Sequence, residues 1–123
     1  MRTFCEIASK TLIPSLRALI ASILIEKYKM TQVDVARKLG ITQPAISYYL
    51  RSKRGKQALE ILRSNEKIMK LVAEMADKIY REDNTEIIYK DFCSLCSAIR
   101  SDEEIMKFIE EHIFKKNFAK TLE

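Results

Sequence analysis

The chain has 123 residues, enough for one domain with a modest core or for one domain with a dimerising extension. Its hydrophobic content of 47% excludes a disordered or fibrous protein, and two glycines in the whole chain argue against most nucleotide-binding loops. Leu, Ile, Ala, Lys and Glu dominate the composition, which predicts an all-α protein.

Charge is divided unevenly along the chain, whose net charge is +5. Residues 29–70 hold ten bases and three acids, a balance of +7, whereas residues 71–123 hold eight bases and twelve acids, a balance of −4. A cationic middle third beside an acidic tail indicates a polyanionic partner for the middle third, although a solvated basic face would give the same counts.

The most apolar run, Thr11 to Ile25, is interrupted by Arg17 and is shorter than the ~20 residues of a membrane span. Glu6 and Lys10 interrupt any N-terminal signal sequence. The odd number of cysteines, three, favours a reducing compartment over a disulfide framework. We therefore expect a cytoplasmic protein with no membrane partner.

The first predicted helix runs from about Leu12 to Lys29 and carries Pro14 in its first turn, where a missing N–H is harmless. Its apolar residues are too many for the single stripe of a surface helix: Leu12, Ile13, Leu16, Ala18, Leu19, Ile20, Ala21, Ile23, Leu24 and Ile25. Such a helix must be buried on more than one side, which favours a subunit partner.

Two short helices follow, separated by a tight turn. The first begins after Thr31, a good N-cap, and ends before Gly40, a good C′ residue. The second begins after Thr42, another N-cap, and runs to about Ser52. Their inward positions are Val35, Ala36, Leu39, Ile46, Tyr49 and Leu50.

Beyond these helices the region of Gly55 is predicted as a loop, and helical periodicity resumes at Ala58. Ser64 is a candidate N-cap for a longer helix, residues 81–86 are a connector, and the sequence SDEE from Ser101 is a capping box that opens a final helix. The inward positions of the last two helices are Ile88, Phe92, Leu95, Cys96, Ile99, Ile105, Phe108, Ile109, His112 and Ile113.

The segment TQVDVARKLGITQPAISYYL, residues 31–50, has the positions that a helix-turn-helix requires. Ala36 supplies the small side chain where the two helices cross, Gly40 the positive φ of the turn, and Ile46 the aliphatic anchor of the second helix. The remaining face of the second helix is polar or flat and is predicted to enter the major groove of DNA: Gln43, Pro44, Ser47, Tyr48 and Arg51.

This motif resembles the helix-turn-helix of lambda-repressor and Cro-type regulators, the XRE-like group. The resemblance implies phosphate contacts from Gln32 and Thr42, and it puts Gln43 where the family commonly reads adenine. Pro44 replaces a residue that is often polar in the family and is suited to contact with a thymine methyl. The implied base-contacting residues are Gln43, Pro44, Ser47 and Tyr48. The alternative is an ordinary helical hairpin with coincidental spacing.

A basic run, RSKRGK, follows the motif directly. Arg51, Lys53, Arg54 and Lys56 are predicted to contact phosphates and so to set the affinity and its salt dependence. A patch that serves only solubility is the alternative.

From Phe4 to Arg100 the chain also resembles a family of archaeal predicted transcriptional regulators. The resembling elements are FCEIASKTLIPSLRALIA, LGITQPAISYYLRSKRG and CSLCSAIR. The resemblance implies a DNA-binding regulator and names neither an effector nor a target.

Cys93 and Cys96 are spaced to lie on one face of a helix, and Cys5 completes the set. Beside packing as small apolar residues, they are candidates for a metal site with Cys5 and His112, an iron–sulfur cluster or a redox-switching disulfide. The resembling family often places a further Cys and His after the IR element, whereas SDEEIMKF supplies neither here. His112 alone fits a partly buried structural residue better than a ligand.

The sequence shows no nucleophile–base set and no metalloprotease motif, so we expect no enzyme and no resident cofactor. It predicts a helix-turn-helix DNA-binding domain over residues 1–63, with the motif at 31–52, followed by a C-terminal helical dimerisation or sensor region over residues 64–123. The expected function is a sequence-specific transcriptional regulator that binds double-stranded DNA as a homodimer, with recognition helix 43–52 in the major groove and residues 51–56 on phosphates. A sequence-tolerant architectural DNA-binding protein and an antitoxin-like helical interaction module are the alternatives, and the effector is unknown.

Overall fold

A computed structural model of the chain describes residues 4–82 and 85–114, without the side chains of residues 4, 54 and 85–89. Within these ranges the regular structure is entirely helical, which confirms the all-α class. The elements are α1 (Phe4–Lys10), α2 (Leu12–Tyr28), α3 (Gln32–Leu39), α4 (Gln43–Arg51), α5 (Lys53–Arg63), α6 (Glu66–Arg81), α7 (Thr85–Ser101), α8 (Glu103–Ile109) and the π-helix η1 (Glu110–Phe114).

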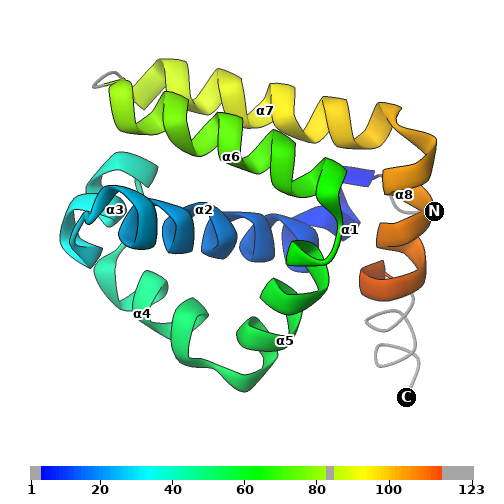
Figure 1. Cartoon of the computed structure of the whole chain (residues 1–123), viewed down its shortest axis with the longest axis horizontal. Coiled ribbons are helices and arrows are strands. Elements are labelled where there is room, and N and C mark those ends of the chain that lie inside the picture. Colours follow the sequence, from blue (N-terminus) through cyan, green and yellow to red (C-terminus); the bar gives the residue numbers. More distant parts are fainter. Residues whose placement is uncertain (1–3, 83–84, 115–123) are drawn as a thin grey trace.

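Helix α2 is the centre of the fold. Figure 1 shows α6 and α7 on one side of it and α4 and α5 on the other, and α1, α3, α4, α5 and α6 all contact it. Its buried residues are Leu12, Leu16, Ala18, Leu19, Ile20, Ala21, Ser22 and Leu24. Burial on several sides is therefore confirmed. The covering comes from the chain itself, so α2 gives no reason of its own to expect a subunit partner.

The limits of α3 and α4 follow from their capping residues, as predicted. The hydroxyl of Thr31 accepts a hydrogen bond from the N–H of Asp34, and that of Thr42 accepts one from the N–H of Ala45. Gly40 ends α3 at φ 69°, in the left-handed region where a side chain is costly. The second and third predicted helices are confirmed with their boundaries.

The predicted loop at Gly55 is wrong, because α5 begins at Lys53 and Gly55 lies in its first turn. The hydroxyl of Ser52 caps this helix by accepting a hydrogen bond of 2.9 Å from the N–H of Gly55. A Cβ at Gly55 would overlap the backbone carbonyl oxygen of Tyr49. The glycine therefore permits a close approach at the corner between α4 and α5, and it does not mark the end of regular structure.

One helix and two N-caps differ from the prediction. The sequence pattern did not predict helix α1. Asn65, and not Ser64, caps α6 through the N–H of Ile68. Asp102, and not Ser101, caps α8, and its hydrogen bond from the N–H of Ile105 holds the pKa of its carboxyl below the usual range, as does nearby Lys67.

One apolar core joins the two predicted regions. Its members include Leu16, Val35 and Ile46 from the first 63 residues and Val72 and Ile99 from the remainder. The division into a DNA-binding domain over 1–63 and a C-terminal region over 64–123 stays a prediction. Among the described helices, none combines the length and apolarity that crossing a bilayer demands.

Replacement of Gly55 by alanine has two opposing effects on the free energy of unfolding. Helix propensity favours alanine by about 0.5–1 kcal/mol, whereas its Cβ would meet a backbone oxygen that cannot move without shifting α4. We expect the steric effect to dominate and Gly55→Ala to lower the free energy of unfolding by about 1–3 kcal/mol in urea titrations. The neighbouring Lys56→Ala, at an exposed position, should change it by less than about 0.5 kcal/mol. A stabilised Gly55→Ala variant would contradict the close approach.

Candidate nucleic-acid interface

Helices α3 and α4 cross at a small side chain. Ala36 is 5% exposed and Ile46 is fully buried, and α3 and α4 are in direct contact. The N–H of Ile41 donates to the carbonyl of Ala36 at 3.0 Å, which ties the turn through Gly40 back onto α3. The three residues that the motif requires thus hold α4 at a defined angle to α3.

The opposite face of α4 is open. Tyr48 is 65% exposed, Pro44 is exposed, and Gln43 and Ser47 are half-buried. Tyr49, one position on, packs against the core, and its ring meets that of Tyr48 edge to face at a centroid distance of 6.2 Å. The outward face predicted from the sequence is therefore accessible along α4.

A hydrogen bond joins the first residues of the two motif helices. The side-chain amide of Gln43 donates to the side-chain oxygen of Gln32 at 2.8 Å. This contact fixes the Gln43 amide relative to α3 and leaves the Gln43 side-chain oxygen as an acceptor and its second N–H as a donor. Sequence reasoning named both glutamines but did not predict that they bond to each other, because the pairing depends on the angle between α3 and α4.

The basic run is helical and lies at the corner between α4 and α5. Arg51, Lys53 and Lys56 are exposed, and Arg51 also donates from Nε to the carbonyl of Ser47 at 3.4 Å. The side chain of Arg54 lies outside the described residues. Exposed cations on two successive helices thus lie where α4 ends and α5 begins.

Comparison with known protein families explains this arrangement. Residues 20–63 match the family model described as helix-turn-helix. This segment is a DNA-binding helix-turn-helix domain of the lambda-repressor and Cro type. The match begins inside α2 and ends with α5. Neither the curated proteins nor the solved structures contain a match to the chain. The expectation that the protein is no enzyme stays a prediction.

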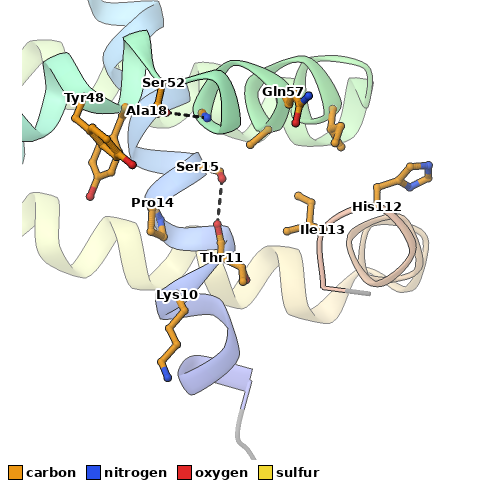
Figure 2. Close-up of a pocket in the computed structure, with 14 residues that line it drawn as sticks. Lys10, Thr11, Pro14, Ser15, Ala18, Tyr48, Ser52, Gln57, His112 and Ile113 are labelled. Atoms are coloured by element: carbon orange, nitrogen blue, oxygen red, sulfur yellow. Dashed lines mark hydrogen bonds between the residues drawn. The ribbon is translucent and has the colours of Figure 1, made fainter. Parts of the chain in front are cut away.

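A hollow of about 330 Å³ lies between the start of α2, the corner of α4 and α5, and η1. Figure 2 shows Ser15, Thr11 and Ile113 around its middle, while the Lys10 ammonium points away. The hydroxyls of Thr11 and Ser15 donate to main-chain carbonyls of Ile7 and Thr11, so they already have partners. The hollow adjoins the recognition helix through Tyr48 and Tyr49, and nothing in the sequence pattern predicted it.

The cysteines come from two helices that are distant in sequence. Cys5 in α1 and Cys93 in α7 are exposed, and Cys96 is half-buried. Burial raises the pKa of the Cys96 thiol, and the neighbouring thiols of Cys93 and Cys5 raise it further, against Arg100 and Arg17. The thiols of Cys93 and Cys5 are therefore close enough to Cys96 to affect it.

The described residues place no group of three His, Cys, Asp or Glu side chains so that it could hold a metal ion. His112 is exposed and not partly buried as expected; its ring stacks on Phe108 at 4.5 Å and lies at the hollow. For Cys5, Cys93 and Cys96, packing as small apolar residues, a metal or iron–sulfur site and a redox-switching disulfide all stay predictions.

The burial of Cys96 predicts an order of alkylation. Thiolates are the reacting species, so a half-buried thiol with a raised pKa should react several-fold more slowly than exposed ones. With iodoacetamide near neutral pH, peptide mass spectrometry should find Cys5 and Cys93 modified before Cys96. In urea all three should react at similar rates. Modification of Cys96 first would show that it is more accessible than the structure indicates.

Proposed function

We propose that the protein is a sequence-specific transcriptional regulator that places α4 in the major groove of DNA. The observation that carries this proposal is the open polar face of α4 on a helix whose opposite face is anchored by Ile46. A helix of this kind in a lambda-repressor-type domain is the element that enters the groove. A protein that coats DNA without regard to sequence has little use for Gln43, Ser47 and Tyr48 on that face.

The side chains divide between bases and phosphates. The amide of Gln43 offers donor and acceptor groups suited to N6 and N7 of adenine, and Ser47 and Tyr48 add further polar groups beside it. Pro44 is suited to a thymine methyl. The proposed phosphate contacts are Gln32 and Thr42 at the starts of α3 and α4, and Arg51, Lys53, Arg54 and Lys56 at the corner.

A homodimer suits this mode of binding. One recognition helix reads only a few base pairs, and proteins of this class obtain affinity and specificity by placing two such helices one DNA turn apart. The region from residue 71 onward has a balance of −4, which would hold it away from phosphates and orient the subunits. Helices from α6 onward are the proposed source of the subunit contact.

Selection from a pool of random duplexes tests the proposal as a whole. We expect a recovered motif with two related half-sites centred about 10 base pairs apart. Binding to that motif should exceed binding to random duplex by at least about a thousandfold. A ratio below about 10 would favour a sequence-tolerant architectural protein. Purification in a stoichiometric complex with another protein, together with no recovered motif, would favour an antitoxin-like module.

Two substitutions then separate base reading from phosphate binding. Gln43→Ala should cost about 1–3 kcal/mol at one position of the selected site and relax the preference there. Lys56→Met should weaken specific and random duplexes about equally and reduce the salt slope by about 1. Lys70→Met, which removes an exposed charge from α6, is the matched control and should change neither. Equal effects of Gln43→Ala and Lys56→Met on both duplexes would contradict the assignment of α4 to the groove.

A further inference from the structure

Lys38 is the single lysine of α3, and its ammonium lies at the C-terminal end of α6. Its Nζ donates to the carbonyl oxygens of Ile79 at 3.2 Å, Tyr80 at 3.1 Å and Glu82 at 2.8 Å. An ammonium has three donors, and three carbonyls of one helix end accept from it. The side chain is half-buried, so these hydrogen bonds are partly shielded from water.

The end of α6 has a physical requirement for such a group. The last carbonyls of a helix have no partners within it and carry the negative end of its dipole. A cation from another helix donates to these carbonyls and also offsets the negative end of the dipole. Here the cation comes from the DNA-binding motif. The contact joins residues 41 to 44 positions apart in the sequence, so it links α3 directly to the C-terminal half of the chain.

A second contact holds the same helix end. The rings of Tyr28 and Tyr80 stack with their centroids 4.2 Å apart, and the Tyr28 hydroxyl donates to Oδ1 of Asp77 at 2.8 Å. Tyr28 is the last residue of α2. The C-terminal ends of α2, α3 and α6 therefore meet at one point.

Helix α3 in turn sets the position of α4. It contacts the recognition helix directly, and the Gln32–Gln43 hydrogen bond joins the starts of the two helices. A tilt of α3 about the α6 end would therefore move Gln43 and the open face of α4 as well.

We propose that Lys38 is a positioning residue for sequence-specific DNA binding, which acts by fixing α3 to the end of α6 and makes no contact with phosphate. The proposal rests on the proposed function. Lys38 thus belongs to the basic middle third but binds carbonyls within the chain, whereas Lys53 and Lys56 are the proposed phosphate contacts. It also makes the α6 end one point at which the C-terminal helices bear on the position of the recognition helix.

The salt dependence of binding tests this role. In Lys38→Met the affinity for the selected site should fall about tenfold, the scale of one lost specific contact, while the affinity for random duplex changes less than about twofold and the salt slope is unchanged. A phosphate contact would instead weaken both duplexes and reduce the slope by about 0.9. That result would overturn the proposal. Lys70→Met is again the matched loss of one charge, with no expected effect.

Two further variants distinguish loss of the Lys38 contact from a general loss of structure. Lys38→Arg keeps a cationic donor at the end of α6 and should recover affinity for the selected site to within about threefold of the unsubstituted protein. Tyr28→Phe keeps the stacked ring and removes only the bond to Asp77, and it should fall between Lys38→Arg and Lys38→Met. A Lys38→Arg protein as defective as Lys38→Met would contradict the capping role.

Amide spectra examine the same contact without DNA. Lys38→Met should shift the amide resonances of residues 79–82 and also those of α4, residues 43–51. Shifts confined to residues 79–82 would show that α3 does not transmit the change, and the proposal would be wrong. If the unsubstituted protein binds no preferred sequence while these shifts reach α4, the proposed function fails and the positioning contact stands.

Discussion

The burial of α2 is the constraint on which the rest of the structure depends. A helix that is apolar on nearly all sides is stable in water only when other elements cover it, and each fully buried Leu or Ile side chain contributes about 1.5–3 kcal/mol relative to exposure. Helices α1, α3, α4, α5 and α6 all contact α2. Because α3, α4 and α5 share this covering with α1 and α6, the DNA-binding motif is part of the core and not an appendage to it. The angle of α4 is therefore set by the same packing that stabilises the chain.

The parts of the fold that were predictable from the sequence are those governed by local chemistry. Thr31, Gly40 and Thr42 cap α3 and α4 because capping involves residues three or four positions apart, so the boundaries follow from the sequence. The start of α5 was missed because Gly55 usually signals a turn, whereas here it serves a contact with the carbonyl of Tyr49 on the preceding helix. That contact exists only when α4 and α5 are already folded against each other.

The candidate site likewise has features that were predictable from local sequence and features that were not. The exposed positions of Pro44 and Tyr48 follow from the period of the helix once Ile46 is known to face inward. The bond between Gln32 and Gln43 and the proximity of Cys5 to Cys96 do not follow, because each depends on the relative position of separate helices. The same holds for Lys38, which the sequence shows only as one more cation in a basic segment.

The cationic middle third is therefore not one uniform surface for DNA. Of its ten bases, Arg37 pairs with Asp34 at 2.8 Å, Lys38 caps α6, Arg63 bonds to Ser22 and Lys67 pairs with Glu104 at 2.7 Å.

These four side chains are bonded to other groups of the chain. Arg51, Lys53 and Lys56 are exposed where α4 ends and α5 begins, and Arg51 also donates to the carbonyl of Ser47 in its own helix. The salt slope counts phosphates neutralised, not lysines present. The balance of +7 in residues 29–70 thus overstates the number of phosphate contacts, and the attraction for a polyanion is concentrated where α4 ends and α5 begins. In the proposed complex, a cluster at that point would favour the orientation in which α4 meets the groove, so the placement of the charges would contribute to orientation as well as to affinity.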